Sequence, residues 1–409
     1  MFARGRALGR GPTTAHAGRD HGGPGGTRWY TRRDPDQLAE GRQNVPGSAP
    51  STLTVAVVGA TGAVGRTMTQ VLLEKRFPMT ALRLLASERS AGKTVAVPGW
   101  GDITVELATP ESFEGIDIAL FSAGGGTSKE LAPEAAKRGC TVVDNSSAWR
   151  MDPAIPLVVS QVNPDDLAWH EGIIANPNCS TMQLMPPMMA LRDAVGIERM
   201  VVDTYQAVSG TGHKAIVELE EQVKAHAEGR PKVANVYPYN IGFNALPHID
   251  VFMENGYTKE EWKVVTESRK ILHLPDLRVS CTAVRVPVFM SHSEAVHVET
   301  RAPITPDEAR ALFAQVPGVV VQDDPSNKVY PLAEHAAGSD LVFVGRVRQD
   351  PSIPDGKGLA FWVVSDNLRK GAASNAVEIA EVLVARGWVA AASRRGAAAG
   401  ASAGGRSGA

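Results

Sequence analysis

Short apolar runs separated by mixed polar segments recur along the first half of the chain. Residues 54–58, TVAVV, form a continuous β-branched and apolar run, which is typical of a parallel strand buried on both faces. Further strands are predicted at 81–87, 116–124, 141–146, 156–160 and 172–176, with a helix at 128–138. Alternation of buried strands with helices predicts a mostly parallel, doubly wound α/β sheet.

A glycine-rich turn follows the first predicted strand and precedes an amphipathic helix. It places Gly59, Gly62 and Gly65 in the pattern GxxGxxG, whereas the usual dinucleotide fingerprint reads GxGxxG. Glycine permits the tight turn and lets backbone N–H groups approach a pyrophosphate at the helix N-terminus. Because strand, turn and helix occur in this order, we predict a dinucleotide site. A purely structural turn is the alternative.

The loop after the second predicted strand, SERSAGK at 87–93, bears on which dinucleotide binds. An acidic residue there suits the ribose 2′-hydroxyl of NAD, whereas Arg and Ser suit a 2′-phosphate. Glu88 favours NAD, but Arg89, Ser90 and Lys93 outnumber it. The sequence therefore predicts NADP(H). The alternative is a solvated polar loop.

Cys179 follows the predicted strand at 172–176 in the stretch ANPNCST. Ser180 and Thr181 can cap a following helix, and a thiol at a helix N-terminus has a lowered pKa. Asn178 and nearby N–H groups could stabilise an oxyanion. The sequence thus suggests a nucleophile, with a buried structural cysteine as the alternative. The pair Pro186-Pro187 predicts that the helix kinks or restarts there.

A nucleophile needs a base, and His292 is the candidate, just beyond the predicted strand at 279–289. Cys281, Ala283 and Arg285 share one face of that strand by two-residue alternation. An arginine within an apolar strand is costly unless it meets an anion. We therefore expect His292 and Arg285 to share a cleft. A turn or edge histidine is the alternative.

Composition and charge limit the function classes. The formal net charge is −2, so no global field favours nucleic acid or an anionic membrane, and no apolar run approaches the length of a bilayer span. The three cysteines are far apart and form no CxxC pair. This favours a reducing cytoplasm and argues against disulfides or a structural metal site. Residues 1–52 and 392–409 are poor in apolar periodicity, so we expect two disordered extensions.

Taken together, these segments resemble the aspartate-β-semialdehyde dehydrogenase family. The matching motifs occur in the family's order and cover roughly residues 54–385. The most specific are IIANPNCST, the downstream RVPVFMSH and SDNLRKGAA; GATGAVG, ASERSAGK, YQAVSGTG and EEWK also match.

The resemblance implies reductive dephosphorylation of L-aspartyl 4-phosphate to L-aspartate 4-semialdehyde and phosphate, with NADPH as hydride donor and a cysteine thioester as intermediate. This reaction belongs to the biosynthesis of lysine, diaminopimelate, threonine, methionine and isoleucine. An acyl phosphate is activated, and a thiolate that displaces phosphate divides one hard step into two.

The resemblance also assigns roles to individual residues. Cys179 matches the nucleophile and His292 the general acid/base. Gln206 matches the residue that orients the substrate, and Arg285 the clamp on its α-carboxylate. The remaining matches are Glu260 for the substrate ammonium, Arg150 and Lys263 for phosphate, and Thr61, Gly62, Ala63, Val64, Arg89, Ser90, Ser209, Gly210 and Asn367 for the cofactor.

The family architecture implies two domains. A Rossmann-type cofactor domain spans 53–178 plus 367–388, where the last helix rejoins it. A catalytic and dimerisation domain spans 179–366 and carries a mixed, largely antiparallel sheet. Its strand candidates lie at 200–208, 278–289, 294–301, 341–348 and 359–366. The resemblance implies a homodimer or homotetramer.

The sequence leaves three alternatives to this family. N-acetyl-glutamyl-phosphate reductase shares the architecture but typically reads NPGCYPT around its cysteine, and glyceraldehyde-3-phosphate dehydrogenase typically reads SCTTN. Asn178 and Ser180 argue against both. A non-enzymatic relative would have lost the cysteine or the histidine. The chain departs from the family at Ser160-Gln161, where many relatives read Pro-Glu, and at Thr211, where alanine is common.

Overall fold

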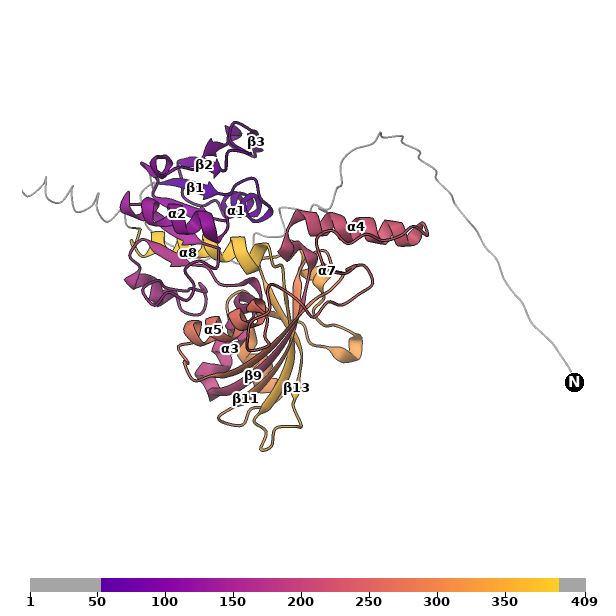
Figure 1. Cartoon of the computed structure of the whole chain (residues 1–409). Helices are drawn as coiled ribbons and strands as arrows, with labels where there is room; N and C mark the ends of the chain where they lie inside the picture. The colour runs from indigo at the N-terminus through magenta and orange to yellow at the C-terminus, as the bar shows by residue number, and fades with distance from the viewer. Residues whose placement is uncertain (1–52, 390–409) are drawn as a thin grey trace, which may run out of the picture. The chain divides into compact units, whose positions relative to one another are not determined.

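Residues 53–389 are the part of the chain that this computed structural model describes. The expectations for residues 1–52 and 392–409 concern residues outside that range. The described part contains two six-stranded sheets and a two-stranded one (Figure 1). Across these residues, no helix has both the length and the apolar character needed to cross a bilayer.

The first sheet is parallel throughout, in the strand order β5-β2-β1-β6-β7-β8. Its strands are β1 (Thr54–Val58), β2 (Ala81–Ala86), β5 (Glu106–Leu107), β6 (Ile118–Phe121), β7 (Thr141–Asp144) and β8 (Ile173–Ala175). A separate antiparallel hairpin follows β2 and consists of β3 (Thr94–Val97) and β4 (Gly101–Thr104).

Helices cover both faces of this sheet. They are α1 (Ala63–Glu74), α2 (Gly125–Lys137) and α8 (Asn375–Ala385). Val58 shares a core with Leu131 of α2, whereas its neighbour Val57 shares another with Met68 of α1 and Leu383 of α8. Successive strand residues thus face opposite layers, which confirms the predicted doubly wound α/β sheet.

The strand predicted at 156–160 is wrong. Only Leu157 pairs, through an isolated parallel bridge to Ala175. Val158 N–H still donates to the carbonyl of Ala175 in β8. The next two backbone donors are taken by side chains, because Val159 N–H donates to Asn163 Oδ1 and Ser160 N–H donates to Asn375 Oδ1. Buried apolar residues therefore did not suffice to make a strand, since the pairing with β8 stops after one bridge.

The second sheet is mixed, in the strand order β10-β9-β11-β14-β13-β12. The pairs β10–β9 and β12–β13 are parallel, and the three other pairs are antiparallel. This confirms the expected mixed, largely antiparallel sheet. The strands are β9 (Ile197–Gln206), β10 (Arg278–Arg285), β11 (His292–Thr300), β12 (Val319–Val321), β13 (Val342–Gln349) and β14 (Gly358–Ser365).

The helices of this second half are α3 (Cys179–Val195), α4 (His213–Ala227), α5 (Lys259–Ile271), α6 (Pro306–Gln315) and α7 (Ala333–Ala336). A π-helical segment, η6 (Arg369–Ser374), leads into α8. The predicted final helix is thus present, but its first turns are π-helical. Shorter 3₁₀ turns occur at Pro110–Phe113, Pro164–Trp169, Val208–Thr211 (η4) and Pro325–Asn327.

The first half of helix α3 is buried on all sides. Every residue from Ser180 to Met188 is buried, including Pro186 and Pro187. The helix contacts β9, β11 and β14 on one side and α5, α6 and η6 elsewhere. The predicted restart at the two prolines does not occur, because this surrounding packing holds a helix that local propensity disfavours.

Candidate active site

Four strands of the second sheet end together beneath α3, and their terminal residues form one transverse row. Arg285 of β10 lies opposite Gln206 of β9, and His292 of β11 lies opposite Ser365 of β14. The pairing of Ser293 with Tyr205 places His292 next to Gln206. The row therefore reads Arg285, Gln206, His292, Ser365, and all four residues are buried.

Helix α3 is tied to this row by its first residues. Gln206 Nε2 donates a hydrogen bond to the hydroxyl of Ser180. Ser365 donates its hydroxyl hydrogen to Gln183 Oε1, at 2.8 Å. Cys179 begins the same helix, so these contacts position the thiol relative to Gln206 and His292.

Asn178 caps α3 and links it to α5. Its side-chain oxygen accepts hydrogen bonds from the backbone N–H groups of Ser180 and Thr181, at 3.0 and 3.4 Å. Its Nδ2 donates to Glu260 Oε1 at 2.9 Å, and its backbone N–H donates to Glu267 Oε2 at 2.7 Å. The predicted cap therefore exists, but Asn178 provides it instead of Ser180 or Thr181.

The environment of Cys179 raises the pKa of its thiol to about 12. Burial is the main cause, followed by the negative charge of Glu260, while Arg150, Arg285 and Lys263 act in the opposite direction. The expected lowering by the helix N-terminus is wrong for this structure, because loss of hydration outweighs the dipole. Cys179 is thus a thiol whose ionisation depends on added positive charge or on a proton acceptor.

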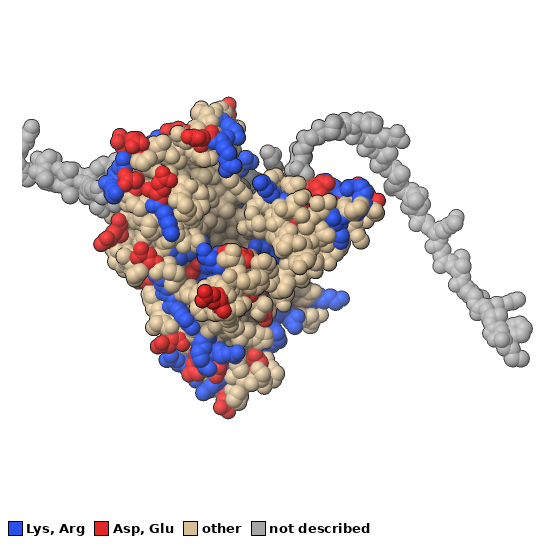
Figure 2. Space-filling view, in the orientation of Figure 1, with Lys and Arg blue, Asp and Glu red and all other residues tan. Residues whose placement is uncertain are grey.

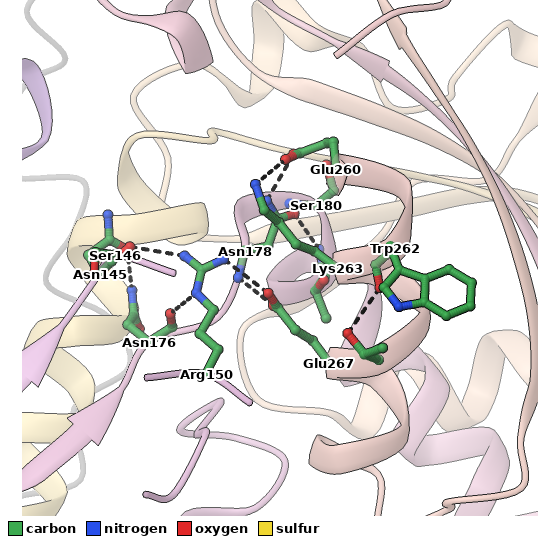
Figure 3. A network of polar contacts seen from close by, with 12 residues as sticks. Asn145, Ser146, Arg150, Asn176, Asn178, Ser180, Glu260, Trp262, Lys263 and Glu267 are labelled. Carbon is green, nitrogen blue, oxygen red and sulfur yellow. Dashed lines mark hydrogen bonds and ion pairs between the residues drawn. The ribbon is translucent and has the colours of Figure 1, made fainter. Parts of the chain in front are cut away.

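One face of α5 presents Glu260, Lys263 and Glu267 toward α3 (Figure 3). Lys263 Nζ lies 2.9 Å from both Glu260 Oε2 and Asp250 Oδ2. Burial works against the charge of Glu260, but Lys263 and the amides of Asn178 and Gln206 lower its pKa to about 2. Glu260 therefore stays ionised at the edge of the site, beside a cation.

Arg150 lies at the carboxyl edge of the first sheet and reaches α5 (Figure 3). Its Nη1 is 3.0 Å from Glu267 Oε1, and the side chains of both residues are buried. Its Nε and Nη2 donate to the carbonyls of Asn176 and Asn145, each at 2.9 Å. Three of the five guanidinium donors are thereby used, which leaves two for a ligand.

His292 is fully buried, and its ring has a fixed tautomer. Its Nδ1 accepts the backbone N–H of Ala207 at 3.0 Å, so the neutral ring carries its proton on Nε2. That nitrogen has no partner among the described residues. Burial and then Arg285 lower the pKa of His292 to about 3, so the ring is an uncharged hydrogen-bond donor.

Gly210 faces the same ring. A Cβ at this position would lie 3.3 Å from His292 Nε2 and 3.1 Å from Arg285 Nη1. Arg285 in turn donates from Nη1 to the carbonyl of Ala207 at 2.7 Å, while its Nε has no partner in the described part of the chain. Because Gly210 has no side chain, the turn at 207–210 can approach both side chains closely.

Two further groups of predicted residues meet at the glycine turn and at η4. Thr61 donates its hydroxyl hydrogen to Ser90 at 3.1 Å, beside Gly62, Ala63 and Val64 at the start of α1. Ser209 donates to Asn367 Oδ1 at 3.0 Å. Asn367 Nδ2 is buried and without a partner among residues 53–389. Arg89 is exposed in the turn after β2.

Figure 2 shows a hollow on one face, between the region of β2 and the region of α5, with both Lys or Arg and Asp or Glu atoms at its lower edge. The glycine turn is tight for a physical reason, since a Cβ at Gly65 would lie 2.3 Å from the carbonyl oxygen of Gly59. The side-chain amide of Asn367, which has no partner in the described part of the chain, and the helix N-terminus at Gly62 are donors that fit a polar anionic cofactor.

Sequence reasoning missed several residues of the site. Glu267 holds both Arg150 and the backbone of Asn178, although it received no role. Its spacing from Glu260 and Lys263, seven and four residues, puts it on the same helix face, which is a signal that was present in the sequence. Gln183 and Ser365 gave no such signal, because they meet only through the packing of α3 on β14.

Two family models match the chain. "Semialdehyde dehydrogenase, NAD binding domain" matches residues 54–170, and "Semialdehyde dehydrogenase, dimerisation domain" matches residues 188–370. The curated aspartate-semialdehyde dehydrogenase of Aquifex aeolicus is 56% identical over 339 residues, covering 82% of this chain and 99% of that relative. The chain belongs to the aspartate-semialdehyde dehydrogenase family. Its close relatives are aspartate-semialdehyde dehydrogenases, which are oxidoreductases, as the resemblance implied.

Other comparisons agree. The aspartate-semialdehyde dehydrogenase of Bacillus subtilis is 51% identical and covers 81% of this chain and 97% of its own length. Among solved structures, aspartate semialdehyde dehydrogenase II from Vibrio cholerae, complexed with ASA, has a TM-score of 0.79 and 48% identity, covering 82% of this chain and 98% of that one. The enzyme therefore combines an NAD(P)-binding domain and a dimerisation domain.

Proposed function

We propose that this enzyme reduces L-aspartyl 4-phosphate to L-aspartate 4-semialdehyde and phosphate, with NADPH as hydride donor and a thioester on Cys179 as intermediate. The observation that carries the proposal is the transverse row of Arg285, Gln206 and His292 beneath the N-terminus of α3, where Cys179 begins. The product lies on the route to lysine, diaminopimelate, threonine, methionine and isoleucine.

In the first step, the sulfur of Cys179 attacks the acyl carbon, and the bond from that carbon to the phosphate oxygen breaks. The thiol proton leaves with the phosphate, which departs as hydrogen phosphate. Arg150 and Lys263 supply positive charge beside the site and favour both the nascent thiolate and the departing anion. The high pKa of the free thiol makes this assistance necessary.

In the second step, His292 acts on the carbonyl oxygen of the thioester. Its Nε2–H is the free donor of the ring, so it stabilises negative charge on that oxygen when hydride reaches the acyl carbon. Collapse of the tetrahedral species breaks the C–S bond and releases the aldehyde. The thiolate of Cys179 then takes a proton, which its raised pKa favours.

A bound NADPH supplies the hydride. The residues fit such a cofactor, because the turn at Gly59–Gly62 leaves the N-terminus of α1 open and Asn367 Nδ2 lacks a partner in the described part. Thr61, Ser90 and Arg89 are the proposed contacts to the ribose phosphate, and Ser209 and Gly210 those near the reactive ring. A Candida albicans aspartate semialdehyde dehydrogenase, similar in fold, was solved with NADP.

Substrate recognition follows from charge. Arg285 has a buried Nε without a partner among residues 53–389, and a guanidinium suits the α-carboxylate of an amino acid. Glu260 is ionised and fits the α-ammonium group. Gln206 lies between them, bonded to Ser180 and Glu260, and orients the acyl group.

The test is the reverse reaction, followed by NADPH absorbance with L-aspartate 4-semialdehyde, NADP⁺ and phosphate. We expect phosphate-dependent NADPH formation by the wild type and none by Cys179→Ala. Cys140→Ala is the matched control, because Cys140 is a buried cysteine just before β7, and it should retain activity. Equal rates for wild type and Cys179→Ala would refute the thioester.

A competing substrate separates aspartate-semialdehyde dehydrogenase activity from that of N-acetyl-glutamyl-phosphate reductase, which has the same architecture. N-acetylglutamate semialdehyde, supplied in place of the aspartate compound, should give less than a hundredth of the rate, because Glu260 needs a free ammonium group. A faster rate with the acetylated compound would reassign the substrate. Mass spectrometry of the quenched enzyme should locate the acyl group on Cys179.

We also propose that the enzyme is a homodimer through the face of the second sheet that points away from α3. This face carries Tyr205, whose ring contacts Trp362 at 5.4 Å between centroids. A groove runs beside it between Trp362 and Tyr330, and Tyr330 and Leu332 are exposed. The matching dimerisation-domain model spans this sheet. Light scattering should give twice the mass of one chain for the wild type and the mass of one chain for Tyr330→Asp.

A further inference from the structure

Glu294 is a buried carboxyl group that the proposed mechanism does not use. It lies on β11, two residues after His292, so both side chains are on the sheet face beneath α3. It is 0% exposed. Neither of its carboxyl oxygens has a hydrogen-bond partner among the described residues. A buried polar group without a partner is rare and needs an explanation.

Two neighbouring polar side chains, Thr204 and Gln183, could form hydrogen bonds with Glu294. Thr204 lies directly opposite Glu294 in the sheet, and its buried hydroxyl also lacks a partner in the described chain. Gln183 of α3 accepts a hydrogen bond from Ser365 at its Oε1, and its Nε2 has no partner within residues 53–389. Burial raises the pKa of Glu294, and Gln183, which approaches the carboxyl group without reaching good hydrogen-bond geometry, opposes that rise to a smaller extent. Amide hydrogens, a hydroxyl and a protonated carboxyl group can satisfy one another, directly or through one buried water.

These residues lie where α3 meets the catalytic row. Ser180 bonds Gln206 of β9, and Gln183 bonds Ser365 of β14. The central strand β11 lies between these two, and among the described residues its Glu294 faces Gln183 of α3 without a hydrogen bond of good geometry. Glu294 is the residue of β11 that can make this third link.

We propose that Glu294 is an uncharged positioning residue, whose carboxylic acid joins Gln183 to Thr204 and so holds α3, and with it Cys179, in register with His292. The inference rests on the proposed function for its effect on turnover, whereas the protonation of Glu294 is independent of it.

The surroundings of Glu294 are consistent with a neutral acid. The sheet face contributes Cys281, Arg285 and His292, and the first turn of α3 contributes Cys179. Helix α5 adds the carboxyl groups of Glu260 and Glu261, which bond Gln206 and the backbone of Ala283. Burial raises the pKa of both thiols and lowers that of His292, whereas Arg285 and Glu260 are charged. Burial also raises the pKa of Glu294 well above its usual value.

Kinetics test the positioning role. Glu294→Gln keeps an uncharged hydrogen-bonding group of the same length, so it should retain at least a third of wild-type kcat. Glu294→Met leaves Thr204 and Gln183 unpaired and should lower kcat at least tenfold with KM changed less than twofold. Val296→Ala, the next buried residue on this face, is the control: it should lower Tm and leave kcat within twofold.

Two readouts test protonation without any turnover. The infrared difference spectrum of wild type minus Glu294→Gln at pH 8 should contain the C=O stretch of a protonated carboxylic acid. A folded pKa above the unfolded value near 4.3 means that stability from this group is full below that value and is lost as pH rises. As the pH rises from 5 to 8, the Tm of the wild type should therefore fall relative to the Tm of Glu294→Gln.

The outcomes are separable. A carboxylate band in place of the acid band, or Glu294→Gln as impaired as Glu294→Met, would overturn the neutral acid. Full kcat in Glu294→Met would overturn the positioning role. If the wild type had no activity toward L-aspartate 4-semialdehyde, the proposed function would fail, while the infrared and Tm measurements would still decide the state of Glu294.

Discussion

Arg150 and Glu267 form a buried ion pair, 3.0 Å between Nη1 and Oε1, that joins the carboxyl edge of the first sheet to α5. The same carboxylate accepts the backbone N–H of Asn178. A single buried charge pair thus holds a proposed phosphate-binding arginine and the residue before the nucleophile in fixed positions.

Glu267→Gln should therefore be strongly destabilising. Removing one charge leaves the Arg150 guanidinium buried without its counter-ion, which typically costs about 3–5 kcal/mol. Urea denaturation should show this as a lower midpoint with an unchanged slope. Glu134→Gln removes a carboxylate from two surface pairs, with Lys137 and Arg138, and should leave the midpoint nearly unchanged. Equal midpoints for Glu267→Gln and wild type would show that the ion pair does not hold this junction.

His292 predicts a pH dependence of stability. Its folded pKa of about 3 lies below the unfolded value near 6.5, so the unfolded chain binds the extra proton first. Stability is complete above about pH 6.5 and declines as pH falls, by about 2–3 kcal/mol from this residue at pH 4.5.

The measurement is Tm between pH 7 and pH 4.5 for wild type and His292→Gln. The variant should have the shallower decline, because it lacks the group that titrates. His213→Gln changes an exposed histidine at the start of α4 and should decline like the wild type. Parallel curves for wild type and His292→Gln would mean that His292 is not buried neutral in the folded protein.

The order of strands and helices was readable from the sequence, because each element has its own periodicity and its own turn. Strand β1 and helix α1 lie almost where the apolar run and glycine turn predict them. The failures were non-local. The run at 156–160 pairs with β8 through one bridge only, and its next N–H groups bond Asn163 and Asn375, the latter from the far end of the chain.

In the candidate site, too, the sequence predicted the local features and missed the non-local ones. Cys179, His292 and Arg285 carry local chemical signals, and the resemblance supplied their roles. That His292 and Arg285 share one row with Gln206 depends on strand register between segments some 80 residues apart, which no local pattern encodes. The raised pKa of Cys179 had the same origin, since a sequence shows the helix N-terminus but not the burial that outweighs it.

Arg89 should decide the preference for NADP over NAD. It is exposed beside Ser90, whose hydroxyl bonds Thr61 at the glycine turn. Arg89→Ala removes a charge-assisted contact to a 2′-phosphate, so KM for NADP⁺ should rise about tenfold or more, with KM for NAD⁺ unchanged. Lys129→Ala, an exposed lysine on α2, is the control. Equal increases for both cofactors would remove Arg89 from 2′-phosphate recognition.

Gly371 should be required for the position of the nucleophile. It lies in η6, and a Cβ there would be 2.8 Å from the Cβ of Cys179 and 3.3 Å from its Cα. Neither side can move easily, because η6 and α3 are both buried. Gly371→Ala should therefore displace Cys179 and lower kcat by about a hundredfold.

Gly126→Ala is the control, because it adds the same methyl group in α2, where nothing lies within 4 Å, and it should leave kcat unchanged. Cofactor binding, measured as the rise in Tm with NADP⁺, should survive in both variants. Wild-type kcat in a well-folded Gly371→Ala variant would show that the thiol tolerates displacement by the methyl group, and the tight approach of η6 would then serve packing alone.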